Sequence, residues 1–423
     1  MATSIDLRYG EQHLLVELPS DTVTVFRHPR VAGLADEHAA FVSAVRTPIG
    51  TPPLSVVIQP GDTVAVGIPD ITRWLPLDRL LLWLFEELPG VRPEDVVIVN
   101  GTGSHRENTP EELARMMGPE VARCFRIINH RARDLSTLTV VGHMPSGQPL
   151  SANKDFLHAK RRIVLGFIEP HFMAGWSGGY KGCFPAFGGL DCIVEYHGAD
   201  IIGHPNSTWL KLEGNPTQEC IRHCGRQIGI DFLVNVTLNP ERQLTGFFCG
   251  DPIAAHETGC AAARPSMTVP CARRFPVVIT TNRGYPADLN LYQAVKGMTA
   301  AADIVESGGL IIAAAECRDG FPDHGNFKQL LFTYPTPDAF LAALHGPGFP
   351  VFDQWEVQML AKVRERARVA LKSALPPSDV SRAWLTPIDD VAACVDAELK
   401  RIGRTAPIAV IPGGFDVVPY LAE

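Results

Sequence analysis

Short runs of apolar, often β-branched residues that end abruptly in polar or glycine-rich turns are the feature that most constrains the fold of this chain. Such uninterrupted apolar runs are typical of strands that are buried on both faces of a sheet. The sequence therefore predicts an α/β fold with mostly parallel or mixed sheets. The predicted strands are 63–68, 96–99, 163–168, 232–238, 277–281, 310–315 and 408–411.

Helical stretches lie between these strands. The sequence Thr-Pro-Glu-Glu at 109–112 places an N-cap residue, a proline at the first helical position and an acid three residues after the cap, so a helix is predicted to start there. A second helix is predicted from about Asp288 to just before Gly308. A third, rich in Arg and Lys, is predicted over 353–375, where Pro376 and Pro377 follow.

The length of 423 residues allows two or three domains. The stretch 258–276 contains a small-residue segment and two prolines before the next strand, which indicates a connection between domains. We therefore predict two α/β domains, 1–270 and 271–423, with a cleft between them in which a ligand binds.

Charge and hydropathy exclude several classes of protein. The net charge of -8 comes from interspersed acidic and basic residues, so no polybasic face for a nucleic acid is expected. The N-terminus lacks the pattern of a signal peptide, and no window approaches the length of a membrane span, so a cytoplasmic protein is expected.

None of the 10 cysteines forms a CxxC pair. Cys220, His223 and Cys224 share a helix face that could hold a metal, but buried, reduced thiols are the more common explanation.

Polar residues that directly follow strands are the first candidates for a site, because ligands of open α/β sheets gather at the carboxyl ends of strands. After the strand 63–68 come Asp70, Thr72 and Arg73, a carboxylate, a hydroxyl and a guanidinium. The arginine could bind a carboxylate or a phosphate, or the Asp–Arg pair could simply fix the loop. The two interpretations are equally supported at this point.

A second candidate segment is 100–107, with the sequence NGTGSHRE. Gly101 and Gly103 would let the backbone approach a ligand closely, and the helix that follows favours an anion at its start. His105 lies at the tip of this segment. Its alternative role is a histidine that hydrogen-bonds only within its own loop.

A third segment, 169–189, carries His171 and the sequence Ser-Gly-Gly-Tyr-Lys that ends at Lys181. The spacing is not that of a Walker motif, so nucleotide triphosphatase chemistry is disfavoured. A lysine in such a segment can also be a point of covalent attachment. His197, further along, is flanked by apolar residues, and a histidine of this kind is usually a hydrogen-bonded core residue.

Taken together, these segments resemble a known family. The series DxTR, GTGSHR, HxxxGxSGGxK and a later histidine, followed by NLYQAVKG at 290–297 and DQW at 353–355, is similar to the lactate racemase family. The likeness runs from Asp70 to Trp355 in order and without large gaps, which makes it more specific than any single motif.

The resemblance implies a cofactor and a set of roles. The family's cofactor is the nickel-pincer nucleotide, a pyridinium-3,5-bisthiocarboxylate mononucleotide that binds nickel, and the match would attach it covalently to Lys181, in a cleft between the domains. His197 would be the protein's nickel ligand, and His105 and His171 would transfer protons. By the same resemblance the cofactor would be held by Asp70, Ile71, Thr72 and Arg73, and the substrate would be contacted by Arg73, Gln293, Lys296 and Trp355. The N-terminal domain would then bind the cofactor, and the C-terminal domain would complete the substrate pocket.

The expected reaction is inversion at C2 of a small 2-hydroxy acid, lactate-like or malate-like. The α-hydrogen of such an acid is hard to remove as a proton, and transfer as hydride to the cofactor through a 2-keto acid avoids that step. Two bases at different positions suit two enantiomers. The expected partners are the small substrate and cofactor-synthesis enzymes that act in trans, with no nucleic acid and no membrane.

Several alternatives stay open from the sequence. The same machinery could serve a 2-epimerase of a longer sugar acid, and a non-catalytic protein could bind the nickel cofactor without needing His105 or His171. A conventional metal hydrolase would give Lys181 no role. A second carboxylate, as in malate, would need another cation or donor, for which Arg283, Arg318 and His324 are candidates by position, although surface roles are more common for such residues.

Overall fold

The computed structural model describes residues 2–19, 21–88, 90–323 and 325–422. The chain forms two compact units. Unit 1 contains Met1–Pro29, His197–Pro205 and Pro265–Glu423, and unit 2 contains Arg30–Tyr196 and Asn206–Arg264.

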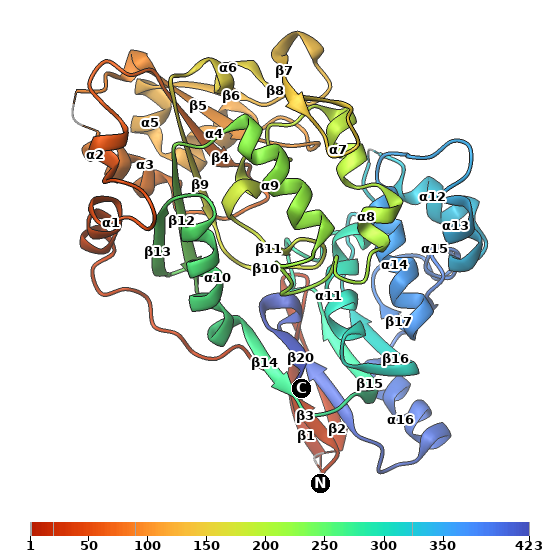
Figure 1. Ribbon diagram of the computed structural model, residues 1–423. Coiled ribbons are helices and arrows are strands. Elements are labelled where there is room, and N and C mark those ends of the chain that lie inside the picture. Colours follow the sequence, from red (N-terminus) through yellow and green to blue (C-terminus); the bar gives the residue numbers. More distant parts are fainter. Residues whose placement is uncertain (1, 20, 89, 324, 423) are drawn as a thin grey trace. The chain divides into compact units, whose positions relative to one another are not determined.

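Unit 2 is built on a six-stranded sheet with the order β13-β12-β9-β4-β5-β6 (Figure 1). β12, β9, β4, β5 and β6 are parallel to their neighbours, and β13 pairs antiparallel with β12. The strand bounds are β4 Val64–Pro69, β5 Val96–Gly101, β6 Arg126–Asn129, β9 Arg161–Phe167, β12 Phe232–Leu238 and β13 Leu244–Gly250. These strands confirm the prediction of an α/β fold with a mixed sheet.

Both faces of this sheet are covered, which explains the continuous apolar runs in the sequence. Successive side chains of a strand point to opposite faces. Val64 and Val66 of β4 therefore pack in one core cluster, with residues of α1, α3 and α4, whereas Ala65 packs in the other, with residues of α6, α7 and α9.

The helices of unit 2 begin where the sequence supplies caps. The predicted start at Thr109 is confirmed by a capping box in which the Thr109 side chain accepts from the Glu112 amide. The helices are α1 Glu37–Arg46, α2 Leu54–Val57, α3 Leu77–Glu86, α4 Pro110–Met117, α5 Pro119–Cys124, α6 Lys154–His158, α7 Leu190–Tyr196 and α9 Pro216–Ile228, and α10 Ala254–Met267 begins in this unit. Short 3-10 turns and two hairpins complete it: η1 Pro93–Asp95, η2 Leu135–Thr137, η3 Gly179–Gly182, β7 Leu138–His143 with β8 Pro149–Asn153, and β10 Pro170–His171 with β11 Gly175–Trp176.

Unit 1 is built on a second six-stranded sheet, with the order β18-β17-β16-β15-β19-β3. All of its neighbouring strands are parallel. The strands are β3 Val23–Val25, β15 Phe275–Thr281, β16 Val305–Ala314, β17 Arg368–Lys372, β18 Thr386–Pro387 and β19 Ile408–Ile411, with the pairs β1 Ala2–Tyr9 and β2 Gln12–Pro19, and β14 Thr268–Cys271 and β20 Val418–Leu421. The helices are α8 Ala199–Gly203, α11 Leu291–Ala302, α12 Phe327–Thr333, α13 Pro337–Ala343, α14 Gln354–Arg366, α15 Pro377–Arg382, α16 Val391–Ile402 and the turn η4 Gly414–Asp416.

The first residues of the chain belong to unit 1 for a physical reason. β3 pairs with β19 at the edge of the parallel sheet, and the β1–β2 hairpin packs in one core cluster with β15 and β16. The sequence prediction assigned 1–29 and 197–205 to the N-terminal part, whereas these segments lie in unit 1. The division at 270 and 271 stays a prediction about independently folding domains.

Two local predictions were wrong. The helix expected over 353–375 ends at Arg366, because Val369, Ala370 and Leu371 form a buried strand, β17, that pairs with β16. The helix expected from about Asp288 to just before Gly308 ends at Ala302, because β16 begins at Val305. In both mispredicted helices, pairing with a strand distant in the sequence decided where the helix ends. The stretch 258–276, predicted to connect two domains, contains the passage from unit 2 to unit 1 between Arg264 and Pro265, and it is formed by α10 through Met267 and then β14.

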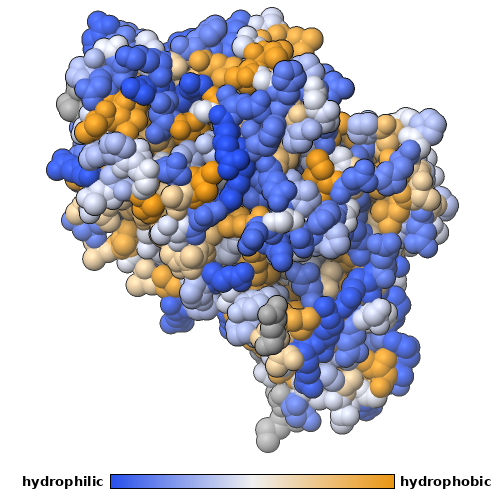
Figure 2. All heavy atoms as spheres, in the orientation of Figure 1, coloured by the Kyte–Doolittle hydropathy of each residue, from blue (hydrophilic) through white to orange (hydrophobic). Residues whose placement is uncertain are grey.

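Among the described residues no helix is long and apolar enough to cross a membrane. On the face seen in Figure 2, hydrophilic residues cover most of the surface, and hydrophobic residues lie in separate patches.

Phe187 connects the segment that follows Lys181 to the sheet of unit 2. Its side chain is fully buried and its ring centroid lies 4.5 Å from that of Phe156. A Cβ at Gly67 of β4 would lie 2.7 Å from Phe187 Cζ, and one at Gly101 of β5 would lie 3.2 Å from Cε1. The two glycines therefore make room for this ring on the sheet.

We predict that Phe187→Ala lowers the free energy of unfolding of unit 2 by about 3–5 kcal/mol, because it leaves a cavity against two strands. Hydrogen exchange of the β4 and β5 amides under native conditions measures this loss. The matched control is Leu135→Ala, at a side chain that is 76% exposed, which should change stability by less than about 0.5 kcal/mol. Equal protection of these amides in both variants would contradict the prediction.

Candidate active site

Three of the predicted segments meet at one edge of the sheet in unit 2. Asp70 directly follows β4, the loop with His105 follows β5, and His171 follows β9. These strands are neighbours in the order β9-β4-β5 and run parallel. Their carboxyl ends therefore lie side by side, which is the usual position of a ligand site in such sheets.

Asp70 and His105 are in direct contact in this site. His105 Nδ1 lies 2.7 Å from Asp70 Oδ2. A carboxylate only accepts hydrogen bonds, so His105 donates through Nδ1, and in its neutral form it keeps the lone pair on Nε2. Asp70 is buried, whereas the His105 side chain is 45% exposed. The pair therefore presents a basic nitrogen to solvent and fixes the ring that carries it.

The residues after Asp70 complete its environment. Asp70 Oδ1 accepts from the Thr72 hydroxyl at 2.6 Å and from the Thr72 amide at 3.2 Å, and the Arg73 amide donates to the Asp70 carbonyl. Burial by itself would raise the pKa of the Asp70 carboxyl, but the bonds from His105 and Thr72 and the charge of Arg73 hold it below its usual value. Asp70 is therefore ionised at neutral pH.

Asn108 is a site residue that the sequence did not point out. Its Oδ1 accepts from the Ile71 amide at 3.2 Å and from the Asn100 side chain at 2.9 Å. It thereby joins the loop after β4 to the loop after β5 and keeps Asp70 and His105 in register. The signal in the sequence was weak, because an Asn one residue before the N-cap Thr109 is ordinary turn chemistry.

His171 has the opposite pattern of hydrogen bonds. It lies in the β10–β11 hairpin, and its Nδ1 accepts from the amides of Met173 at 3.2 Å and Ala174 at 3.1 Å. A ring nitrogen that accepts a hydrogen bond carries no proton, so neutral His171 holds its proton on Nε2. The two histidines that were predicted to transfer protons are therefore held in different tautomers.

Lys181 lies in the 3-10 turn η3, and its amide donates to the Gly178 carbonyl at 3.1 Å. Its side chain is half-buried. Asp70, His105, His171 and Lys181 all belong to unit 2.

The predicted residues of unit 1 are His197, Gln293, Lys296 and Trp355. The rings of His197 and Trp355 are stacked with centroids 4.3 Å apart and an interplanar angle of 26°. Trp355 Nε1 donates to the Tyr292 hydroxyl at 3.0 Å. Tyr292 lies in the motif at 290–297 but was not predicted as a site residue, so its role in holding Trp355 was missed.

Gln293 and Lys296 lie one helical turn apart on α11, and Lys296 Nζ donates to Gln293 Oε1 at 2.6 Å. Glu356 of α14 is fully buried, and its Oε1 has no hydrogen-bond partner among the described residues. Burial raises the pKa of Glu356 to about 8, with the charge of Lys296 opposing the rise and that of Asp353 adding to it. This carboxyl, which the sequence prediction did not include, is electrostatically linked to a predicted substrate residue.

The other candidates do not form sites. Arg283 is ion-paired with Asp416, and Arg318 donates to Glu316 at 2.7 Å. His324 lies outside the described residues. Among the residues that the structure describes, no group of three or more His, Cys, Asp or Glu side chains is placed to hold a metal ion, and His223 donates instead to the His143 carbonyl.

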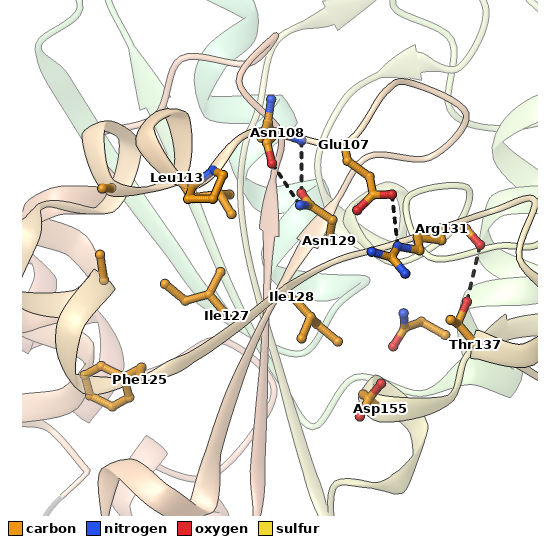
Figure 3. A pocket seen from close by; sticks show the side chains of 14 residues that line it. Glu107, Asn108, Leu113, Phe125, Ile127, Ile128, Asn129, Arg131, Thr137 and Asp155 are labelled. Atoms are coloured by element: carbon orange, nitrogen blue, oxygen red, sulfur yellow. Dashed lines mark hydrogen bonds and ion pairs between the residues drawn. The ribbon is translucent and has the colours of Figure 1, made fainter.

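A separate hollow of about 580 Å³ lies beside the edge strand β6 (Figure 3). Its walls include Leu113, Phe125 and Ile127, and the ion pair between Arg131 and Glu107, 2.9 Å apart, lies at its border. The side chains of Asp70, His105, His171 and Lys181 do not line it.

Comparison with known proteins identifies the family. The family model described as the lactate racemase N-terminal domain matches residues 9–210, and the one described as the lactate racemase C-terminal domain matches 272–419. A lactate racemase of Lactiplantibacillus plantarum is 30% identical over 422 residues, which cover 98% of this chain and 99% of that protein. The chain belongs to the lactate racemase family. It is therefore an isomerase of the racemase type.

Further relatives agree with this result. A lactate racemase of Thermoanaerobacterium thermosaccharolyticum is 29% identical over 421 residues, which cover 98% of this chain and 99% of that protein. The solved structure of the lactate racemase apoprotein from that organism matches with a TM-score of 0.91 and covers 99% of this chain and 100% of that one. A solved protein of Thermotoga maritima, 17% identical with a TM-score of 0.67 and covering 86% of this chain and 95% of its own, shares the fold.

We predict that His105 and His171 differ in tautomer in this protein when it is purified without cofactor. Neutral His105 should carry its proton on Nδ1 and neutral His171 on Nε2, because one ring donates to Asp70 and the other accepts from backbone amides. Nitrogen-15 NMR of the histidine rings measures this, with His105→Gln and His171→Gln for assignment. Asp70→Asn should turn the His105 signal into a mixture of tautomers and leave that of His171 unchanged. Identical tautomers at both rings in the native protein would refute the assignment.

Proposed function

We propose that this racemase inverts C2 of a small 2-hydroxy acid, lactate-like or malate-like, by reversible hydride transfer to a nickel-pincer nucleotide through a 2-keto acid. The observation that carries the proposal is the contact between the buried Asp70 and His105, in which Asp70 Oδ2 lies 2.7 Å from His105 Nδ1. This contact leaves His105 Nε2 available as a base. A protein that only bound a cofactor would need no such pair. The names of the curated relatives, lactate racemase, support the same class of substrate.

The donor atoms of the chain fit this cofactor. Lys181 offers an amine on a short turn between two glycines, Gly179 and Gly182, which suits covalent attachment. His197 offers an imidazole, a ligand that nickel accepts, and the stacked ring of Trp355 fixes its orientation. We propose that both residues serve one cofactor, which cofactor-synthesis enzymes make in trans, and that Asp70, Ile71, Thr72 and Arg73 help to hold it.

When bound, the nickel-pincer nucleotide supplies an acceptor for the C2 hydrogen as hydride. His105 Nε2 takes the hydroxyl proton of one enantiomer, and the ionised Asp70 stabilises the imidazolium that results. Loss of hydride and of this proton leaves a planar 2-keto acid. Return of hydride to the opposite face inverts the centre, and His171 serves the hydroxyl of the other enantiomer.

His171 has to change its bonds to take part in this cycle. Its Nδ1 accepts from the Met173 and Ala174 amides, so a doubly protonated ring is compatible with the chain only if Nδ1 releases both amides. We therefore propose that the hairpin around His171 adjusts in each turnover, whereas the Asp70–His105 pair stays in place.

Substrate binding is assigned to the cations and donors that the family likeness indicates. Arg73, Lys296 and Gln293 would hold the substrate carboxylate, and Trp355 would form a wall of the pocket. The bond between Lys296 and Gln293 already orients the lysine. A guanidinium and an ammonium both bind carboxylates through charge-assisted hydrogen bonds.

We predict that the protein made together with the cofactor-synthesis enzymes carries nickel and a mass adduct on Lys181. Intact mass, peptide mapping and metal analysis measure both. Lys181→Arg should abolish the adduct, because a guanidinium is a poor nucleophile. The matched control is Lys160→Arg, at a lysine that is 65% exposed and paired with Asp62, which should load like the native chain. A native chain without adduct and nickel under these conditions refutes the cofactor assignment.

We predict further that deuterium at C2 of the substrate stays at C2 in the inverted product. Transfer as hydride would return the same hydrogen to C2, whereas removal of the hydrogen as a proton would exchange it with water. Mass spectrometry of the product after partial racemisation in ordinary water measures the retained label. Loss of most of the label on the first inversion would rule out the hydride route and favour direct proton abstraction.

The same assay with a panel of acids separates the substrate classes. Lactate, malate and longer sugar acids are compared by kcat/KM, with inversion at C2 as the common reaction. Preference for a sugar acid would replace the proposed substrate by the longer one and leave the chemistry unchanged.

A further inference from the structure

The turn before Lys181 has a backbone conformation that only glycine adopts readily. Gly178 has φ 94° and ψ -169°, and Gly179 has φ 56°. The Lys181 amide donates to the Gly178 carbonyl, so the orientation of the peptide group after Gly178 sets the direction in which the lysine leaves the turn. Whatever holds the peptide groups around Gly178 therefore holds Lys181.

Two buried side chains clamp the peptide groups on either side of Gly178. His256 Nε2 lies 2.9 Å from the Ser177 carbonyl oxygen, which belongs to the peptide group before Gly178. The Gly179 amide, which belongs to the peptide group after Gly178, donates to Asn235 Oδ1 at 2.8 Å. Each of the two peptide planes is thus held by a different side chain.

These clamps come from rigid parts of unit 2. Asn235 is fully buried in β12, which has β13 on one side and β9 on the other. His256 is 1% exposed and lies in the first turn of α10. Because both anchors belong to a sheet strand and a long helix, they cannot follow a movement of the turn.

The protonation of His256 is fixed as well. A carbonyl oxygen only accepts, so Nε2 carries the proton that is donated to Ser177. Burial lowers the pKa of His256 to about 4, with its bond to the Ser177 carbonyl opposing the shift. The ring is therefore a neutral Nε2–H donor over the whole neutral pH range.

Neither Gly178 nor Gly179 has room for a side chain. A Cβ at Gly178 would lie 2.6 Å from Asn235 Oδ1, and one at Gly179 would lie 2.8 Å from His256 Cγ. Packing alone would be served by apolar side chains at 235 and 256, and a buried amide or imidazole costs free energy unless its hydrogen bonds are made. Asn235 Oδ1 and His256 Nε2 are both directed to this turn, while Asn235 Nδ2 donates to the Val234 carbonyl at 3.3 Å, which points to a role beyond filling the core.

We propose that Asn235 and His256 are positioning residues that hold the Ser177–Gly179 turn so that Lys181 is presented for attachment of the cofactor. This inference rests on the proposed function, in which Lys181 is the attachment point. Neither residue acts on the substrate; both act through the backbone that carries Lys181.

The test uses the full chain and two readouts. The first is the rate of cofactor attachment at Lys181, measured by intact mass during loading. The second is the rate at which acetic anhydride acetylates Lys181 relative to Lys160 in the same sample without cofactor, measured by peptide mapping. Lys160 is 65% exposed and remote in sequence from the turn, so it serves as an internal reference.

Asn235→Leu and His256→Phe each remove one clamp and keep most of the volume. We expect each to slow attachment by about 10- to 100-fold, because a misplaced group loses orientation. The same variants should acetylate Lys181 faster relative to Lys160, because a loosened turn exposes a half-buried side chain. His256→Gln, whose amide can donate to Ser177 in place of Nε2, should restore attachment to within about threefold of the native rate.

A control and a milder variant distinguish loss of a clamp from loss of the fold. Cys260→Ala removes a thiol 3.3 Å from His256 Nε2 but leaves the turn's clamps in place, and it should load like the native chain. Asn235→Ala repeats the first test with a smaller change if Asn235→Leu does not fold. Native rates in both readouts for folded Asn235 and His256 variants overturn the inference. A native chain that takes no adduct, with the acetylation shifts still present, refutes the attachment role of Lys181 and leaves the clamp standing.

Discussion

The parallel pairing of β9, β4 and β5 is the constraint on which the site of unit 2 depends. Because these strands run in the same direction as neighbours, the residues that follow them meet at one edge of the sheet. Asp70, His105 and His171 come together for this reason, although they are far apart in the sequence. Helices cover both faces of the sheet, and the polar site residues lie at the edge formed by the carboxyl ends of its strands.

Hydrogen bonds at the same ring nitrogen give the two histidines different properties. His105 donates through Nδ1 to a buried carboxylate, whereas His171 accepts at Nδ1 from two backbone amides, so the two neutral rings carry their protons on different nitrogens. A racemase has to handle two mirror-image substrates with side chains that are not mirror images. The difference between the rings makes the two directions chemically distinct, even where the equilibrium between enantiomers is symmetric.

The segment from Ser177 to Phe187 combines anchoring at both ends with a reactive group between them. Asn235 and His256 hold its start, and Phe187 packs into the space left by Gly67 and Gly101 at its end. Lys181 lies between these anchors on a single short turn. Rigid support on both sides is what a residue needs when it carries a cofactor that must meet a substrate in one orientation.

The sequence by itself determined the α/β class, most strands and the family, because apolar runs, helix caps and ordered motifs are local patterns. It also indicated His105, His171 and Lys181, but it left open that His105 hydrogen-bonds only within its own loop. Only the tertiary structure decided that Asp70 is its partner, that Asn235 inside an apolar strand faces the Lys181 turn, and that 368–372 is a strand and not the end of a helix. Each of these outcomes depends on contacts between residues distant in the chain, which no local pattern encodes.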